Sequence, residues 1–109
     1  MLVFAVGSAL LPASATPNGE VLTGRFHCGK QGVAMGLPPG VFTVAYYGLG
    51  EQEKAVLPLH GKKIVFAIGM SADGSRYVRG RYTWWDAATP SFTIGDRPHD
   101  KTIYCKHAD

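Results

Sequence analysis

The sequence predicts an all-β protein, a small antiparallel β-barrel of about eight strands closed by one disulfide. Short runs of β-branched and aromatic residues alternate with turn residues, and no long stretch has helical periodicity. Two cysteines, Cys28 and Cys105, lie in the first and last predicted strands. A two-sheet sandwich would show the same strand pattern. A bridge between the terminal strands makes them neighbours, however, and a closed barrel leaves no exposed edge, so we favour the barrel.

Length and composition indicate one packed domain. A chain of 109 residues is too short to divide into two cores. Apolar residues make up 46% and charged residues 17%, which excludes a disordered chain. The net charge is +3, but the basic residues are scattered and no nucleic-acid-binding motif is present. We therefore expect no nucleic-acid partner.

The start of the chain has the pattern of a signal peptide. Residues 2–11 form an uncharged apolar run, and the small residues Ala13-Ser14-Ala15 follow it as at a cleavage site. A short buried helix or strand is the alternative, whereas a membrane span needs about 20 residues. No cysteine follows the run, so no lipid anchor is expected. We expect residues 1–15 to be removed and residues 16–109 to form a domain exported to the periplasm.

Export to an oxidising compartment would allow Cys28 and Cys105 to pair. The adjacent His27 and nearby His107 suggest a four-ligand metal site as the alternative. Neighbouring residues of a strand point to opposite faces, however, and no zinc-site spacing is present. Gly48-Leu49-Gly50 lacks the third glycine of a dinucleotide site. The sequence therefore predicts a disulfide, no metal and no cofactor.

The sequence predicts three strands in the first half of the domain. Residues 41–47 alternate most clearly, with Phe42, Val44 and Tyr46 on one face. Pro58 places the strand 54–59 at an edge, a bulge or an end. We expect the first strand at residues 20–28, with a bulge or close approach at Gly24. We expect a loop at residues 29–40, in which 33–35 could form a short strand, and a turn at 48–52.

The second half contains the most distinctive stretch. Ser71, Asp73, Gly74 and Ser75 favour a tight turn. An extended segment, residues 76–85, follows, and its arginines and aromatics offer donors for carboxylates and flat apolar area, which suits protein recognition. Further strands are expected at residues 63–68, 91–94 and 101–105, the first of them apolar on both sides and therefore in a wall of the barrel.

Within that extended segment we expect a bulge at Gly80. Without one, Tyr77 and Tyr82 would point to opposite faces of a continuous strand.

Several elements of this sequence occur together in one known family. Phe26-His27-Cys28, the stretch Ser71-Ala72-Asp73-Gly74-Ser75-Arg76-Tyr77, the pair Trp84-Trp85 and the late Cys105 resemble the bacterial inhibitors of C-type lysozyme. The resemblance implies a small β-barrel whose loop around Ser71–Tyr77 enters the lysozyme active-site cleft and blocks it. Without a lipid-attachment cysteine, the chain resembles the soluble periplasmic branch.

The chain departs from the family at two positions. In the family, a serine before the loop glycine and a lysine shortly after the tryptophan reach the catalytic carboxyl groups of lysozyme. Here these positions are Asp73 and Ala87. Asp73 could accept a hydrogen bond from the protonated acid, whereas facing the ionised one would weaken binding. We expect arginines to replace the missing lysine, and the predicted lysozyme-binding residues are Ser71, Asp73, Gly74, Ser75, Arg76, Tyr77, Arg79, Arg81, Trp85 and Ala87.

Each of these residues also has a structural interpretation. Tyr77 and Trp85 could pack in the barrel, and Ser71 and Asp73 could simply hold the turn. Two other function classes are an enzyme and a ligand-binding barrel. No catalytic motif surrounds His60 or the serines, so we expect no enzyme. A barrel that binds a small apolar ligand is the stronger alternative, and an interior filled by side chains such as Phe42, Val44, Ile64, Phe66 and Ile68 would disfavour it. The sequence leaves a homodimer open.

Overall fold

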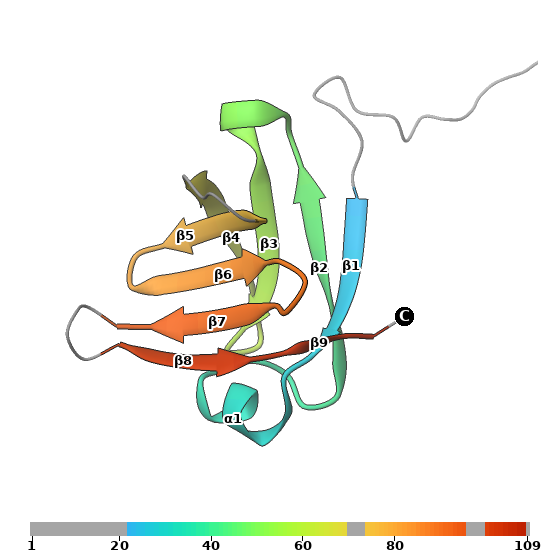
Figure 1. Ribbon diagram of the computed structural model, residues 1–109, viewed down its shortest axis with the longest axis vertical. Coiled ribbons are helices and arrows are strands. Elements are labelled where there is room, and N and C mark those ends of the chain that lie inside the picture. Colours follow the sequence, from blue (N-terminus) through green and yellow to red (C-terminus); the bar gives the residue numbers. More distant parts are fainter. Residues whose placement is uncertain (1–21, 70–73, 96–99, 109) are drawn as a thin grey trace, which may run out of the picture.

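The alternating segments of the chain form strands that pair into one antiparallel sheet. The computed structural model describes residues 22–69, 74–95 and 100–108, and in these residues the sheet has nine strands in the order β8-β7-β6-β5-β4-β3-β2-β1-β9 (Figure 1). The strands are β1 (Leu22–His27), β2 (Val41–Tyr47), β3 (Lys54–Leu59), β4 (Lys62–Gly69), β5 (Ser75–Arg79), β6 (Tyr82–Asp86), β7 (Ser91–Ile94), β8 (Lys101–Tyr104) and β9 (Lys106–His107).

The last segment of the chain closes the sheet into a barrel. Only Cys105 separates β8, which pairs with β7, from β9, which pairs with β1. The Cys105 backbone N–H donates to the Pro90 carbonyl oxygen at 2.8 Å, and the Ala108 N–H donates to the Arg25 carbonyl oxygen at 2.9 Å. One continuous stretch therefore joins both edges of the sheet, which confirms the predicted antiparallel barrel.

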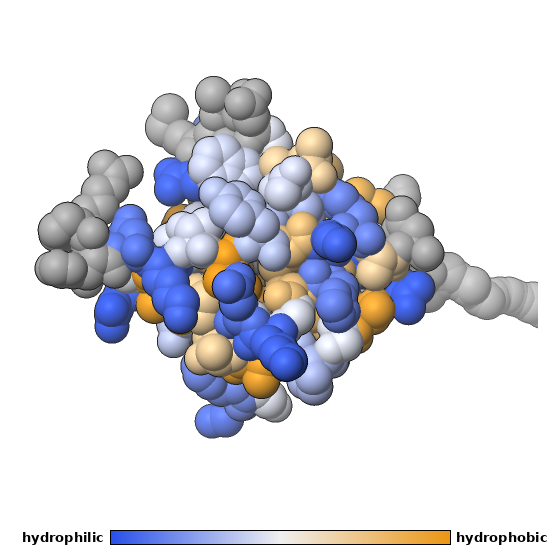
Figure 2. Space-filling view, turned by 60° about the horizontal axis from the view of Figure 1, so that its bottom comes forward, coloured by the Kyte–Doolittle hydropathy of each residue, from blue (hydrophilic) through white to orange (hydrophobic). Residues whose placement is uncertain are grey.

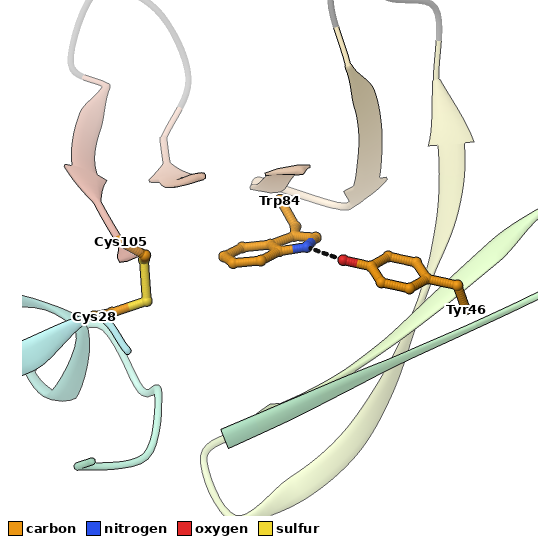
Figure 3. Close-up of a disulfide and its surroundings, with 4 residues drawn as sticks. All are labelled: Cys28, Tyr46, Trp84 and Cys105. Atoms are coloured by element: carbon orange, nitrogen blue, oxygen red, sulfur yellow. Dashed lines mark hydrogen bonds between the residues drawn. A yellow bond between two sulfur atoms is a disulfide. The ribbon is translucent and has the colours of Figure 1, made fainter. Parts of the chain in front are cut away.

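The disulfide lies beside this closing stretch. Cys28 and Cys105 are bonded with their Cα atoms 4.2 Å apart, which confirms the predicted pair (Figure 3). Both cysteines are therefore unavailable as metal ligands. Within residues 22–69, 74–95 and 100–108, no three His, Cys, Asp or Glu side chains gather as a metal site would require. No helix in the same ranges is long and apolar enough to cross a membrane.

A short helix occupies part of the segment that we predicted as a loop. α1 spans Gly29–Ala34, so the loop prediction and the optional strand at 33–35 are both wrong there. The helix packs closely, since a Cβ on Gly32 would lie 2.6 Å from the Cβ of Cys28. Just after α1, Met35 and Leu37 are buried. The helix lies across one end of the barrel (Figure 1), and the side chains of Met35 and Leu37 belong to the core.

A two-residue turn takes the place of the expected bulge at Gly80. The pairing of Arg79 with Tyr82 leaves only Gly80 and Arg81 between β5 and β6, and Gly80 has φ +58°. Two-residue hairpin loops need a positive φ at the first position, which glycine adopts readily. The segment 76–85 is therefore two strands rather than one. The turn, not a bulge, brings Tyr77 and Tyr82 to the same inward face.

Other strand predictions are confirmed in detail. Phe42, Val44 and Tyr46 of β2 are all buried on one face. β2 pairs with β3 only along Lys54–Val56, so Pro58 lies beyond that pairing, where β2 requires no N–H from it. Gly24 pairs regularly with Val44 and is a site of close approach, because a Cβ there would lie 2.8 Å from the Phe26 ring. The predicted turn at 48–52 includes a short 3₁₀ helix, η2 (Gly50–Gln52).

Aromatic side chains fill the interior. The largest fully buried side chains include Trp84, Tyr77, Phe26, Phe66 and Phe92. The Phe26 ring lies edge-on to Trp84 with the centroids 4.8 Å apart, an arrangement that the ring quadrupoles favour. The Trp84 indole N–H donates to the Tyr46 hydroxyl at 2.9 Å (Figure 3). The polar atoms of the aromatic core are thus hydrogen-bonded rather than left without a partner.

Candidate functional site

The β5–β6 hairpin places the predicted site residues in two groups. We call its open side the loop end (Gly74–Arg76 and Trp85–Ala87) and its turn the hairpin tip (Arg79–Arg81). Arg76 and Arg79 are three residues apart in β5, and a strand rises about 3.3 Å per residue, so roughly 10 Å separates the two groups. Ser71 and Asp73 lie outside the described residues. The structure therefore does not bring the three arginines of this segment together.

At the loop end, Gly74 packs directly against Ala87. A Cβ on Gly74 would lie 2.6 Å from the Asp86 carbonyl oxygen and 2.9 Å from the Ala87 Cβ, and Gly74 has φ +67°. Glycine alone suits both this backbone conformation and this close approach. Ser75 pairs with Asp86 in the adjoining ladder. The loop glycine and the position of the family's lysine thus lie side by side, although they are 13 positions apart in the sequence.

Arg76 and Trp85 form a cross-strand pair beside this contact. They are directly opposite in the β5–β6 ladder, and both are half-buried. The Arg76 guanidinium lies over Gly69 of β4, where a Cβ would be 3.4 Å from Nη2. Of the three arginines in the segment, Arg76 is the one at the loop end.

Tyr77 supports the loop end from inside the barrel. Its side chain is 1% exposed, and its hydroxyl donates to a carboxylate oxygen of Glu53. The Tyr77 ring lies 5.3 Å from the Tyr46 ring, centroid to centroid. Burial raises the pKa of the Tyr77 phenol well above its ordinary value, and the Glu53 hydrogen bond adds to the shift. The structure thus places Tyr77 in the core, as its structural interpretation describes.

Tyr46 is the second phenol beneath the loop end. Burial raises its pKa well above the ordinary value, the Trp84 hydrogen bond opposes the shift, and the Asp86 carboxylate adds to it. Both phenols therefore stay protonated at neutral pH. Their hydrogen bonds link β2 to β6 and the residue preceding β3 to β5 directly below the candidate site.

Two further carboxylates lie near the loop end. Glu51 and Glu53 line a hollow of about 790 Å³ together with Gly50, Ile68 and Gly69. Sequence reasoning missed both glutamates because they precede Gly74 by more than 20 residues and belong to no motif. Only the pairing of β3 with β4 and of β4 with β5 brings them to this end.

The hairpin tip has different surroundings. Arg79 is exposed, and its guanidinium donates to the Val65 carbonyl oxygen of β4 at 3.2 Å. The Arg81 side chain is also exposed, and its carbonyl oxygen accepts from the Gly95 N–H at 3.0 Å. Both arginines line a hollow of about 340 Å³ next to the β3–β4 turn.

Comparison with known proteins identifies the family. A family model described as membrane-bound lysozyme-inhibitor of c-type lysozyme matches residues 38–98. The chain belongs to this family. Membrane-bound lysozyme inhibitors of C-type lysozyme from Pseudomonas aeruginosa and Cupriavidus necator are 36% and 37% identical to it over 56 and 43 residues. These matches cover 50% and 39% of this chain, but only 44% and 34% of the relatives, so less than half of each relative is matched.

A solved structure has the same barrel fold as this chain. A chain in the crystal structure of Pseudomonas aeruginosa MliC in complex with hen egg white lysozyme matches with a TM-score of 0.61 and 23% identity. The match covers 92% of this chain and 98% of that chain. The family model confirms the resemblance seen in the sequence, and its matched residues 38–98 include both Gly74 and Ala87.

Proposed function

We propose that this protein inhibits a C-type lysozyme by inserting its loop end into the active-site cleft. The contact between Gly74 and Ala87 carries the proposal, because Gly74 directly follows the position of the family's serine and Ala87 occupies the position of its lysine. Family membership supports the function, as does the complex of the Pseudomonas aeruginosa relative with hen egg white lysozyme. The proposed action is steric and electrostatic, and it needs no catalytic group on this chain.

Arg76 is our candidate for the cation that the family supplies by lysine. A lysozyme cleft holds one carboxyl group that is protonated near neutral pH and one that is ionised. A guanidinium can bind the ionised carboxylate through two parallel hydrogen bonds. Arg76 lies at the loop end, whereas Arg79 and Arg81 lie at the hairpin tip. Of the three, Arg76 is therefore the arginine placed to bind the ionised carboxylate. We propose that Asp73 accepts a hydrogen bond from the protonated carboxyl group of lysozyme.

The buried hydrogen bonds beneath the site favour a rigid binding surface. Tyr77 is held by Glu53 and Trp84 by Tyr46, and both pairs lie under the loop end. A surface that is already ordered loses less conformational entropy on binding, so more of the contact energy appears as affinity. We therefore expect lysozyme to meet a preformed β5–β6 edge.

The test is a titration of hen egg white lysozyme activity on cell-wall substrate with the purified protein. We expect activity to fall in proportion to added protein until the enzyme is saturated. Arg76→Ala should weaken inhibition at least tenfold, since removing one partner of a buried charge pair costs about 2–5 kcal/mol. Arg79→Ala is the matched control, because it removes the same charge about 10 Å away, and it should leave inhibition unchanged.

A rescue variant sharpens this test. Adding Ala87→Lys to Arg76→Ala places a cation beside Gly74, at the position of the family's lysine, and should restore inhibition. Unchanged lysozyme activity at every protein concentration would contradict the proposed function. Equal losses in Arg76→Ala and Arg79→Ala would instead contradict the assignment of the loop end.

The alternative function, a barrel that binds an apolar ligand, has less support. Phe42, Val44 and Phe66 are buried, and Ile64 and Ile68 pack against them, as expected of a filled interior. The hollows at the loop end and at the hairpin tip both open to solvent. The observed packing favours protein recognition on the outside of the barrel.

We further propose that residues 1–15 direct export and that residues 16–109 act in the periplasm. The disulfide supports an oxidising compartment, and the relatives are named as membrane-bound inhibitors. Mass spectrometry of the protein recovered from the periplasm should give a chain that begins at Thr16. A chain that still carries the apolar run would contradict this part of the proposal.

A further inference from the structure

The hollow at the hairpin tip forms where two parts of the sheet diverge. β5 pairs with β4 only along Ala67–Gly69, so the first half of β4 separates from the tip of the hairpin. The Arg79 guanidinium reaches across this gap to the Val65 carbonyl oxygen. The hollow has a volume of about 340 Å³, which is within the range of sites that hold small organic groups.

The lining of this hollow combines apolar and cationic groups. Leu59, Ile64 and Tyr82 contribute apolar surface that adjoins the core. His60, Arg79 and Arg81 are exposed and line the same hollow. Such a combination fits a molecule that carries an anionic group next to an apolar part, because guanidinium groups bind phosphate oxygens through paired hydrogen bonds.

More cations extend around the hollow. Lys62 and Lys63 are exposed beside the β3–β4 turn, and Lys101 is exposed on β8, two strands along from Tyr82. We call Lys62, Lys63, Arg79, Arg81 and Lys101 the basic face. Figure 2, which brings the lower end of the barrel forward, shows a largely hydrophilic surface with smaller apolar areas between.

Carboxylates are concentrated at the other end. Among the described residues, Asp100 is the acidic side chain beside the basic face. Glu51, Glu53 and Asp86 lie around the loop end instead. In the described part of the chain, the net charge is therefore more positive at the hairpin tip than at the loop end, where Arg76 is accompanied by these three carboxylates, so an anionic surface would attract the hairpin-tip end.

We propose that the basic face docks on an anionic phospholipid membrane, with a lipid phosphate bound by Arg79 and Arg81 and the adjoining apolar lipid atoms on Ile64 and Tyr82. The spread of the cations over β4, β5, the β5–β6 turn and β8 suits an extended charged surface. Docking in this orientation directs the loop end away from the membrane and leaves it accessible. The inference is independent of lysozyme inhibition.

The experiment is co-sedimentation of the exported protein, residues 16–109, with vesicles of phosphatidylcholine alone or mixed with phosphatidylglycerol, at 0.1 M salt. The ratio of the two partition coefficients isolates the effect of charge on binding. Each basic residue near an anionic surface contributes about fivefold to binding. The triple variant Lys62→Gln, Lys63→Gln, Arg81→Gln should lower the ratio about a hundredfold.

The control triple variant is Arg25→Gln, Lys54→Gln, Lys106→Gln, which removes the same net charge outside the basic face. We expect it to lower the ratio less than threefold, because charges beyond about 10 Å are screened at this salt concentration. Equal losses in the two triple variants would overturn the proposal in favour of a net-charge effect. No preference of the native chain for anionic vesicles would overturn it as well, as would binding to polyglutamate or inorganic phosphate without binding to vesicles.

Discussion

Removing the Cys28–Cys105 disulfide should destabilise the barrel by about 4.5 kcal/mol in the chain-entropy model. The two cysteines are 77 residues apart, so the bond restricts most of the unfolded domain. The bond also joins the residue preceding α1 to the residue between β8 and β9. Its loss therefore affects both the helix at the end of the barrel and the stretch that closes it.

Urea unfolding measures this effect. With a urea dependence of roughly 1.5 kcal/mol per molar, the Cys28→Ser, Cys105→Ser variant should have its midpoint about 3 M below that of the oxidised protein. Tryptophan fluorescence should report the transition, since Trp84 is fully buried. Reducing agent should shift the midpoint of the native protein by a similar amount and should leave that of the double variant unchanged.

Amide exchange tests the location of the effect. β1 and β9 share only two paired positions, Phe26 with His107 and His27 with Lys106, whereas β3 and β4 share six. The β9 amides should therefore lose protection in the double variant more than the β3–β4 amides do. A midpoint shift below about 0.5 M, or full protection of β9, would refute the argument that the bond stabilises the closing stretch.

Three further predictions concern the loop end and the phenols beneath it. Gly74→Ala should destabilise the fold by about 1–3 kcal/mol more than Gly40→Ala in urea unfolding, because both have positive φ but only Gly74 lacks room for a Cβ; equal losses would contradict the close contact. Tyr46→Phe should cost about 1–3 kcal/mol, since the Trp84 N–H loses its acceptor; an unchanged midpoint would contradict this. The raised pKa values of Tyr46 and Tyr77 mean that the folded state retains these protons, so stability should hold below about pH 10 and fall above it; urea midpoints from pH 8 to 11 should show that fall, and Tyr46→Phe should reduce it.

Sequence periodicity identified the strands where burial alternates cleanly. β2 alternates over seven residues, so both its limits and its inward face could be predicted. α1 could not, because six residues are too few for helical periodicity and its apolar contacts come mainly from the residues that follow it. The turn at Gly80 was missed because Gly-Arg lacks the asparagine or aspartate that marks the commonest hairpin turns.

The candidate site was only partly predictable for a related reason. Motif spacing pointed to Gly74 and Ala87, and the structure shows that they touch. The separation of Arg76 from Arg79 and Arg81 depends on where the hairpin turns, and an assumed continuous strand concealed it. The carboxylates Glu51 and Glu53 reach this region through strand pairing, which the local sequence does not encode.

Hydrogen exchange of the protein with and without hen egg white lysozyme tests the central claim most directly. The proposal predicts slower exchange at Gly74, Ser75 and Ala87 in the complex, with unchanged exchange at Gly80 and Arg81. Protection confined to the hairpin tip, or no protection anywhere on the barrel, would contradict it.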